Sequence, residues 1–393
     1  MIMQDNEKKP ALRFKGFTDP WEQRKVREVT DRYDNLRIPV AASLRVAGTT
    51  PYYGANGIQD YVEGYTHDGE FILVAEDGAN DLKNYPVKCV KGRIWVNNHA
   101  HVLQGKCACA DNQFLAYAIS QADIESLLVG GGRAKLNAET LMDIELLLPS
   151  KNEQIQIGHY LARLDHLITL HQRKYEKLVN IKKSMLDKMF PQNGASVPEI
   201  RFKGFTDPWE QRKLGEIAKA VVRNDPASDA PIMMITAGNG FIEQSDRYAF
   251  NNAGESLKKY ILLECGELAY NHGASKLRPY GSCFALTTVE KARIPFVYHC
   301  FSVEKSNPEF LSIELNGANV ENQLRKIVSS GARMDGLLNI AYSEYTEVTV
   351  QLPKKEEQDW IAKFFKHLDT LIALHQREHI KPILEVKRVK RNE

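Results

Sequence analysis

One thirteen-residue peptide occurs twice in this chain of 393 residues. The letters RFKGFTDPWEQRK run over residues 13–25 and again over 201–213. A second repeated block follows each copy and begins at Leu147 and at Gln351. Its two versions share Leu-Pro, Glu-Gln, Leu-Asp, Leu-Ile and Leu-His-Gln-Arg in register. A solenoid would need many short units, so this pattern predicts two large half-molecules with a common frame.

The segments between the repeats, 26–147 and 214–350, look unrelated to each other except at their ends, where GGRAKLN starts at Gly131 and GARMDGLLN at Gly331. Short runs rich in β-branched and aromatic residues, such as EFILVAEDG and PFVYHCFSV, predict strands. Short helices are expected from Asn112 and Pro308. Each insert is therefore predicted to be an α+β domain.

The second repeated block predicts long helices. Apolar residues between Ile157 and Met189 follow a 4-3-4-3 spacing, which is the heptad pattern of paired helices. An apolar stripe could also belong to a domain core, but the length and the heptad favour helix–helix pairing. The second copy keeps the spacing as far as Ile372 and then reaches Pro382, which predicts that this helix stops or kinks near Lys381.

The predicted divisions are 1–150, a repeat segment with the first insert; 151–190, a central helix; 198–352, the second repeat segment and insert; and 353–393, a helix and tail.

Charge is unevenly divided along the chain, although the net charge is only +2. Basic residues outnumber acidic ones by eight to four in 150–190 and by ten to seven in 353–393. The inserts are acidic, with eleven basic against sixteen acidic residues in 26–147 and thirteen against sixteen in 214–352. A nucleic-acid reader of this composition must gather its positive charges on one face and obtain most phosphate contacts elsewhere.

Cysteines and apolar runs indicate the compartment. The six cysteines form no CxxC pair, which is typical of a reduced, cytoplasmic protein. No apolar run approaches the ~18 residues of a membrane span, so no membrane partner is expected.

Motifs for catalysis or metal binding are weak. The glycine clusters at 130–132 and 238–240 lack the Lys-Ser/Thr of a phosphate-binding loop and fit turns. Four candidate zinc ligands, His99, His101, Cys107 and Cys109, have a spacing that matches no common structural zinc site, and histidines on a strand face are the alternative. No metal site and no catalytic residue are predicted.

The duplicated RFKGFTDPWEQRK, the LP…EQ entry into a helix with LDxLIxLHQR, and the stretches YYGANGIQDYVEGYTHDGEFILVAEDGAN and WVNNHAHVL resemble the specificity subunit of type I restriction-modification systems. The resemblance covers essentially the whole chain. It implies two α+β target-recognition domains that read the two halves of a split sequence in double-stranded DNA, and an antiparallel coiled-coil spacer.

The resemblance also implies a set of partners. Two methyltransferase subunits would dock on the repeats, restriction (translocase) subunits would join them, and the subunit itself would be non-catalytic. S-adenosylmethionine is expected in the partner methyltransferase, and no cofactor is expected on this chain.

Base readout favours polar side chains at loop tips. The candidate DNA-binding residues are Tyr53, Asn56, Asn80, Lys83, Asn97, Asn98 and His99 in the first insert, and Asn271, His272, Ser275, Lys276, Arg278 and Tyr280 in the second. Each of them could instead be an ordinary turn or surface residue. The candidate docking residues are Trp21, Arg24, Leu164, Ile168, Trp209, Arg212, Leu368 and Ile372.

Several alternatives stay open. The FTDPW turns could pack their tryptophans into their own domains, and common ancestry alone could explain the repeat. The chain could also be a stand-alone DNA-binding regulator, although its acidic inserts argue against that. A pure coiled-coil scaffold would leave the two divergent inserts without a purpose.

Overall fold

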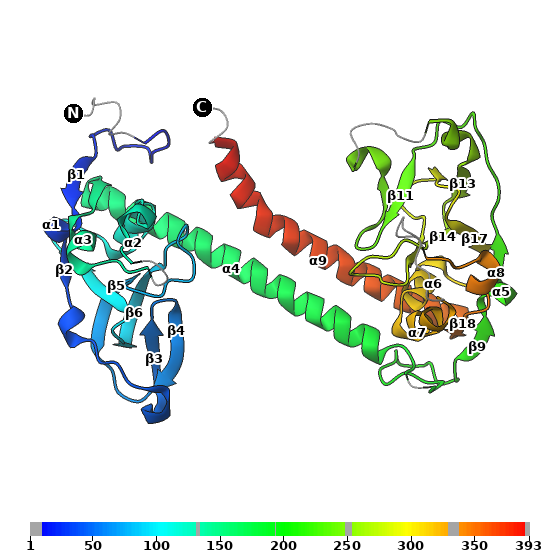
Figure 1. Ribbon diagram of the computed structural model, residues 1–393, viewed down its shortest axis with the longest axis horizontal. Coiled ribbons are helices and arrows are strands. Elements are labelled where there is room, and N and C mark those ends of the chain that lie inside the picture. Colours follow the sequence, from blue (N-terminus) through cyan, green and yellow to red (C-terminus); the bar gives the residue numbers. More distant parts are fainter. Residues whose placement is uncertain (1–9, 131–133, 193, 248–253, 329–337, 390–393) are drawn as a thin grey trace. The chain divides into compact units, whose positions relative to one another are not determined.

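The computed structural model describes residues 10–130, 134–192, 194–247, 254–328 and 338–389, and it divides into two compact units, 1–170 and 171–393. Helices and strands mix in both units, which confirms the α+β prediction (Figure 1). The longest helix, α4 (Lys151–Lys188), begins in unit 1 and ends in unit 2. Its bounds confirm the long helix that the heptad spacing predicts.

Unit 1 contains the first repeat segment, the first insert and the beginning of α4. Its elements are β1 (Glu22–Lys25), α1 (Val26–Val29), β2 (Thr30–Arg32), η2 (Asp34–Leu36), η3 (Ala42–Leu44), β3 (Ala47–Gly54), β4 (Gly57–Val62), β5 (His67–Ala75), β6 (Val87–Val96), β7 (Ala100–Gly105), α2 (Asn112–Ser120), η4 (Glu125–Leu127), α3 (Ala138–Asp143) and β8 (Glu145–Leu148).

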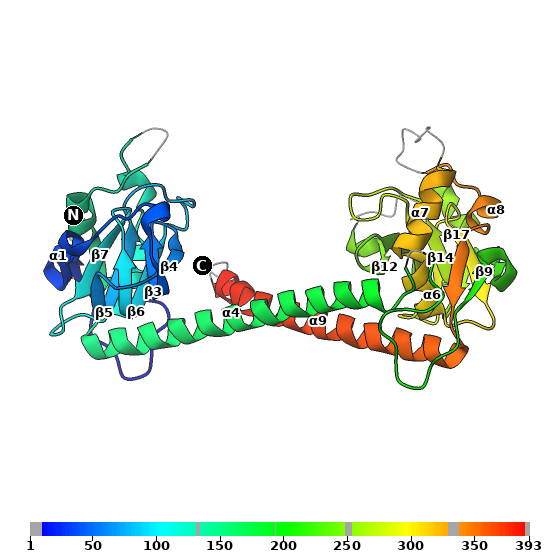
Figure 2. The same cartoon turned by 90° about the horizontal axis from the view of Figure 1, so that it is seen from below.

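A six-stranded sheet in the order β2-β7-β5-β6-β3-β4 forms the body of unit 1 (Figure 2). Neighbouring strands are antiparallel except β3 and β6, which are parallel. The apolar face of α2, with Phe114, Leu115 and Ile119, is buried in the same core as Ile72 and Leu103 of the sheet. The separate pair β1–β8 joins the repeated peptide to the strand just before α4.

Unit 2 contains the second half of α4, the second repeat segment and the second insert. Its further elements are β9 (Glu210–Lys213), α5 (Leu214–Ile217), β10 (Ala218–Ala220), β11 (Met233–Thr236), β12 (Gly240–Glu243), η5 (Gln244–Asp246), η6 (Gly254–Lys259), β13 (Ile261–Glu264), β14 (Leu268–Asn271), β15 (Ser282–Ala285), β16 (Lys291–Ile294), β17 (His299–Val303), α6 (Pro308–Leu315), α7 (Ala318–Ile327), α8 (Tyr342–Tyr345), β18 (Thr349–Leu352) and α9 (Lys355–Val389).

Each insert has its own sheet, and the two sheets have the same order of four strands although the sequences look unrelated. In unit 2 the strand order β10-β17-β14-β15 corresponds to β2-β7-β5-β6 of unit 1, and β9 pairs with β18 as β1 pairs with β8. The expectation that the inserts are unrelated is therefore wrong at the level of topology. Sequence comparison misses the relation because a sheet core needs only apolar side chains of suitable volume at inward positions, and many combinations meet that need.

The second half of α4 packs against α9 inside unit 2. Leu178, Ile181 and Met185 of α4 contact a core that contains Phe365 and Leu368 of α9. Lys182 and Asp369 form an ion pair at 2.5 Å, and His171 Nδ1 lies 3.2 Å from His375 Nδ1. The lower residue number on α4 (His171) faces the higher one on α9 (His375), and Lys182 faces Asp369. The two helices therefore run antiparallel here, as predicted.

The expectation that α9 stops or kinks near Lys381 is wrong as to the stop. The helix continues past Pro382 to Val389 and does not stop near Lys381. A proline removes one backbone hydrogen bond and displaces one carbonyl, but the turns on either side can remain helical. The predicted similarity between Gly131 and Gly331 starts outside the described residues. None of the helices in the described ranges combines the length and the apolar character that a membrane crossing needs.

Candidate nucleic-acid interface

The repeated peptide forms the same buried ion pair in both units. Arg13 donates from Nε and Nη2 to the two carboxylate oxygens of Glu153, and both distances are 2.7 Å. Arg201 makes the same pair of 2.7 Å bonds to Glu357. Both glutamate side chains are essentially inaccessible to solvent. Each copy of the peptide is therefore fixed to the first turn of the long helix that follows its insert.

The Glu-Gln of the repeat has a second structural role in each unit. Gln154 donates to the carbonyl of Pro149 at 2.9 Å and accepts the Asp111 N–H at 3.1 Å. Gln358 donates to the carbonyl of Pro353 at 2.9 Å and accepts the Asn307 N–H at 2.8 Å. These accepted N–H groups precede α2 and α6, so one glutamine connects the start of the long helix to the short helix of the insert.

The tryptophans of the repeat pack into their own units. Trp21 meets Phe114 of α2 edge to face at 6.0 Å, and Trp209 meets Phe310 of α6 at 5.7 Å. Trp209 is buried, and Trp21 is partly buried against the core of unit 1. This placement fits the reading in which the FTDPW turn anchors its own domain.

The remaining docking candidates are distributed between surface and core. Arg24 and Arg212 are exposed and pair with acidic neighbours, namely Glu22 at 3.0 Å and Glu216 at 2.5 Å. On the helices, Leu164, Ile168 and Ile372 are half-buried, whereas Leu368 lies in the core of unit 2. Eight positions of the repeated peptide are exposed in both copies: Lys15/Lys203, Gly16/Gly204, Thr18/Thr206, Asp19/Asp207, Pro20/Pro208, Glu22/Glu210, Gln23/Gln211 and Arg24/Arg212.

Most candidates of the first insert meet at one end of the sheet. Asn56, in the turn between β3 and β4, donates to the Gly78 carbonyl at 2.9 Å and accepts the Asn80 N–H at 2.9 Å. Asn97 Oδ1 accepts the N–H of His99 at 2.8 Å. The sequence candidates of three separate loops are thus brought together.

Their exposure differs strongly. Asn56, Asn80, Lys83 and Asn98 are exposed, and His99 is half-buried. Tyr53 and Asn97 are buried: the Tyr53 ring lies in the core of the sheet, and the Asn97 N–H bonds to the Tyr53 carbonyl at 3.1 Å. Sequence reasoning did not select Asp77, which lies 2.5 Å from His99 Nδ1, because nothing in the local pattern links residues 22 positions apart.

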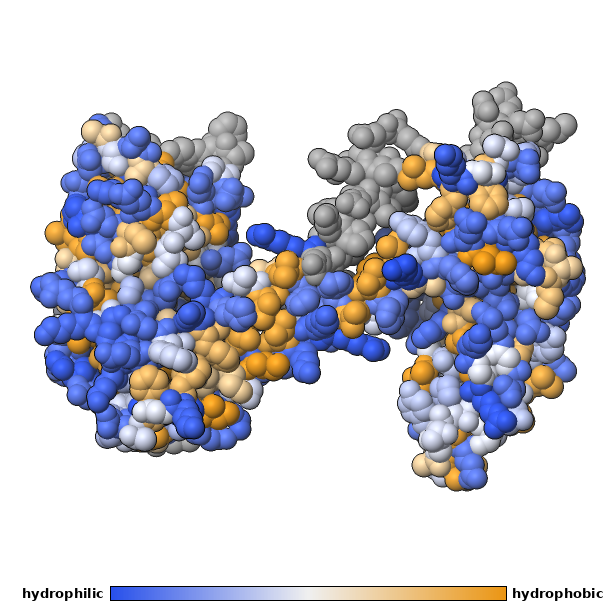
Figure 3. Space-filling model, turned by 180° about the vertical axis from the view of Figure 1, so that it is seen from behind, coloured by the Kyte–Doolittle hydropathy of each residue, from blue (hydrophilic) through white to orange (hydrophobic). Residues whose placement is uncertain are grey.

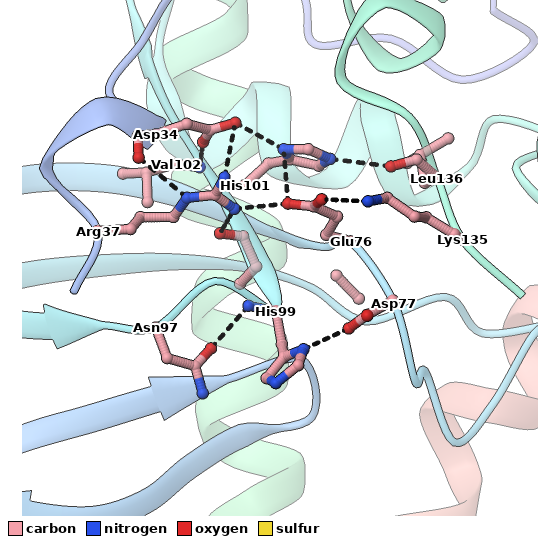
Figure 4. A network of polar contacts seen from close by, with 12 residues as sticks. Asp34, Arg37, Glu76, Asp77, Asn97, His99, His101, Val102, Lys135 and Leu136 are labelled. Carbon is pink, nitrogen blue, oxygen red and sulfur yellow. Dashed lines mark hydrogen bonds and ion pairs between the residues drawn. The ribbon is translucent and has the colours of Figure 1, made fainter. Parts of the chain in front are cut away.

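A network of charged residues lies next to this loop end (Figure 4). His101 is buried, its Nδ1 lies 2.7 Å from Asp34 and its Nε2 lies 2.9 Å from the Leu136 carbonyl. Burial raises the pKa of Asp34, but the hydrogen bonds from His101 and the Val102 N–H outweigh burial and hold it below the ordinary value.

Two further ion pairs complete the network. Burial also acts to raise the pKa of Glu76, but hydrogen bonds from Arg37 at 2.6 Å and from Lys135 at 2.9 Å lower it overall. The network joins the segment after β2, the end of β5, strand β7 and the segment near Lys135. It provides a rigid support for the loops that carry Asn80 and His99.

In the second insert, Asn271 is the last residue of β14, and the other candidates lie in the long loop between β14 and β15. Asn271 donates to the Ile235 carbonyl at 3.1 Å, and Arg278 donates to the Asn316 carbonyl at 2.7 Å. Tyr280 accepts the Tyr270 hydroxyl through its carbonyl at 2.6 Å. These three residues, together with half-buried His272, hold the loop in shape, whereas Ser275 and Lys276 are exposed at its tip.

Residues in the described part of the chain include no group of three or more His, Cys, Asp or Glu side chains that could hold a metal ion. His101 is committed to the charged network, and Cys107 and Cys109 are exposed. All six cysteines are free. On the face drawn in Figure 3, hydrophilic residues cover most of each unit, with separate hydrophobic patches between them.

The structure therefore defines a class of protein with two α+β domains, in which the same frame of contacts supports two different loop ends. Comparison with known proteins shows what the chain is similar to. Residues 18–180 match the model of the type I restriction modification DNA specificity domain. A protein of Haemophilus influenzae assigned as a type I restriction enzyme specificity subunit is 34% identical over 261 residues, which are 61% of this chain and 62% of that protein. The specificity subunit of the EcoprrI type I restriction enzyme from Escherichia coli is 26% identical over 117 residues, 30% of this chain and 28% of that subunit.

The fold agrees with these matches. A crystal structure of the S subunit of a type I restriction-modification system from M. genitalium superposes with a TM-score of 0.62 and 14% identity, and covers 96% of both chains. Residues 18–180 of this chain thus resemble a type I restriction-modification specificity domain, the chain spans less than two thirds of the length of the Haemophilus influenzae relative, and it has the fold of the M. genitalium S subunit.

Proposed function

We propose that this chain is the DNA-recognition subunit of a type I restriction-modification complex and has no catalytic centre of its own. The observation that carries the proposal is the duplication. One frame, built from the Arg–Glu pair, the strand pair and the Gln bridge, holds two loop ends of different sequence. Recognition of a bipartite DNA sequence requires two binding domains, and here each domain is held by the same set of contacts.

Each loop end would read one half of that sequence. Asn80 and Asn98 are exposed, and their amides can pair with adenine or accept and donate at other base edges in the major groove, while the Asn56 amide holds the loop that carries Asn80. Lys83 in unit 1, and Ser275 with Lys276 in unit 2, would contact phosphates or bases. Tyr53 and Asn97 are not part of the proposed contact set, because they are buried.

The exposed residues that are identical in both copies of the peptide favour two docking sites of the same kind, one in each unit. Side chains on the surface can vary with little effect on folding, so thirteen identical residues that include Glu22, Gln23 and Arg24 fit binding of the same partner twice. Two methyltransferase subunits that carry S-adenosylmethionine would occupy these sites, and restriction subunits would join them. Because the inserts carry more acidic than basic residues, these partners would make most of the contacts to DNA phosphates.

The test is to express the full chain with a methyltransferase subunit of a type I system from the same genome and to map methylated adenines in the host genome. We expect methylation at a sequence of two short specified segments with an unspecified gap, and none when the chain is omitted. Methylation that does not depend on the chain, or tight sequence-specific DNA binding by the chain alone, would favour the regulator instead.

A further inference from the structure

The second insert gathers its exposed apolar side chains at one end of its sheet. In the described part of 214–352, the large hydrophobic residues that are exposed are Val222, Leu277, Phe296 and Val297. Leu277 is 65% exposed and Phe296 is 47% exposed. Exposed apolar residues scattered singly need no explanation, but a group confined to one end of a domain indicates a contact surface.

The strand order brings these residues together. Val222 follows the end of β10, and the neighbouring Val221 N–H donates to the Cys300 carbonyl of β17 at 2.8 Å. Phe296 and Val297 precede β17, whose first residue, His299, pairs with Tyr270 near the end of β14. Because neighbouring strands are antiparallel, all of these segments lie at the same end.

Leu277 belongs to the loop that leaves the same end of β14. A methyl group built on Gly238, in the turn between β11 and β12, would lie 3.7 Å from Leu277 Cδ2, so that turn lies beside the loop. The loop tip also carries the exposed Ser275 and Lys276. The ammonium of Lys259 lies 6.0 Å from the centre of the Phe296 ring. The apolar group is therefore flanked by cations.

The corresponding turn of the first insert is polar. Strands β7 and β17 can be aligned through their partner strands. Arg32 and Ala220 each lie seven residues after the end of the repeated peptide, and they pair with Leu103 of β7 and Phe301 of β17. Counting back along both strands places Asn98 and His99 of unit 1 at the positions of Phe296 and Val297 in unit 2. The two loop ends thus have the same backbone position and opposite side-chain chemistry.

On this basis we propose that Phe296 and Leu277 contact the C5-methyl groups of thymines in the half-site read by the second insert. The inference rests on the proposed function and specifies its chemistry. In the major groove thymine is the base that presents a methyl group, and apolar side chains, including phenylalanine, recognise it by contact. Lys259 and Lys276 would bind the adjacent phosphates, which attracts the apolar group to DNA rather than to an uncharged partner.

The experiment uses the full chain with its methyltransferase subunits and a duplex of the mapped target. Each thymine is replaced in turn by deoxyuridine, which lacks only the methyl group, and the dissociation constant is measured. At one or more positions in a single half-site, we expect the wild-type complex to bind about three- to tenfold more weakly. The variant Phe296→Ala should bind thymine and uracil there equally, whereas Val197→Ala, an exposed apolar residue of the segment between α4 and β9, should behave as wild type.

Three results would overturn the inference: uracil without effect at every position, equal uracil sensitivity in wild type and Phe296→Ala, or a half-site for the second insert that contains only G·C pairs. Loss of methyltransferase binding in Phe296→Ala, with uracil sensitivity unchanged, would show a protein interface and would also contradict it. In all these cases a mapped bipartite target would leave the proposed function standing, while absence of any target would remove the function itself.

Discussion

Glu153 and Glu357 are buried carboxylates, and each is satisfied by one arginine of the repeated peptide. Replacing one member of a buried pair leaves the other charge without compensation, which costs far more than loss of an exposed pair. The thirteen-residue repeat therefore contains residues kept for folding as well as residues exposed on the surface. Arg201 and Arg212 of one copy allow the two kinds to be compared.

The first prediction concerns Arg201. The change Arg201→Met should lower the free energy of unfolding of unit 2 by about 3 kcal/mol, because Glu357 keeps its burial and loses both hydrogen bonds. Urea unfolding of the full chain, followed by hydrogen exchange of peptides from unit 2, measures the change. The matched control Arg212→Met removes an exposed pair with Glu216 and should leave unit 2 as stable as before. Equal effects of the two changes would contradict a structural role for Arg201.

A second residue, Glu314 of α6, makes the stability of unit 2 depend on pH. Burial raises its pKa from 4.5 to about 7, although its Oε1 accepts the Gln351 N–H at 3.0 Å. Between these two values the folded state holds a proton that the unfolded state has released. The free energy of unfolding should therefore fall as pH rises from 4.5 to 7, and the loss should remain above pH 7.

The change Glu314→Gln should remove this dependence while keeping an acceptor for the Gln351 N–H. From pH 5 to pH 8, wild type should lose up to about 3 kcal/mol relative to the variant. Urea midpoints measured across this range give the difference. Glu309→Gln, a more exposed position of the same helix, serves as the control and should follow the wild-type curve. A parallel course of wild type and Glu314→Gln would show that Glu314 is ionised throughout.

At the scale of elements, the second half of α4 is a structural part of unit 2 rather than a linker. Phe190 lies just beyond the helix. Its ring stacks on that of Phe310 with 5.7 Å between the ring centres, and its centre lies 5.8 Å from that of the Trp209 ring. It also contacts Phe365 of α9 at 6.1 Å. One aromatic residue thus joins α4, the repeated peptide, the insert and α9.

The change Phe190→Ala should destabilise unit 2 by about 3–4 kcal/mol, because it removes a buried ring and leaves a cavity among other rings. Hydrogen exchange should rise in peptides of β9, α6 and α9. Leu170→Ala, within α4, removes a side chain that is 39% exposed and should change little. If exchange in the insert stayed unchanged in Phe190→Ala, α4 would be an independent rod.

The elements also show where sequence reasoning succeeds and where it does not. The heptad from Ile157 to Met189 predicts α4 correctly, because a long apolar period is a local property of the sequence. The common sheet of the two inserts escaped prediction, since strand order depends on pairing between distant residues. Pro382 shows the opposite error: a strong local signal did not end α9, because a single proline interrupts only one turn.

The candidate site follows the same rule. Asn56, Asn80 and Asn98 are polar residues of predicted turns, and the structure places all three at the surface of one loop end. Tyr53 and Asn97 have the same local signals but are buried, Tyr53 in a hydrophobic cluster of the sheet, and this burial depends on the fold rather than on local sequence. Phe296, which we propose as a thymine contact, carries no polar readout signal in the sequence, and its exposure depends on the fold.

For the whole molecule, the central claim is that one frame carries two interchangeable readers. The frame boundaries coincide in both copies: the peptide ends at Lys25 and at Lys213, and the strand before the long helix ends at Leu148 and at Leu352. The ion pair, strand pair and glutamine bridge that surround an insert are the same in both units. Each insert should therefore fold in either frame.

The most direct measurement places residues 26–146 where 214–350 now stand and maps methylated adenines in cells that contain the methyltransferase. The target half read by the first insert should persist, and the other half should become a second copy of the same bases. The unaltered chain, mapped in the same host, identifies the two original halves. A target in which both halves change together, or in which the second half stays as it was, would contradict the account.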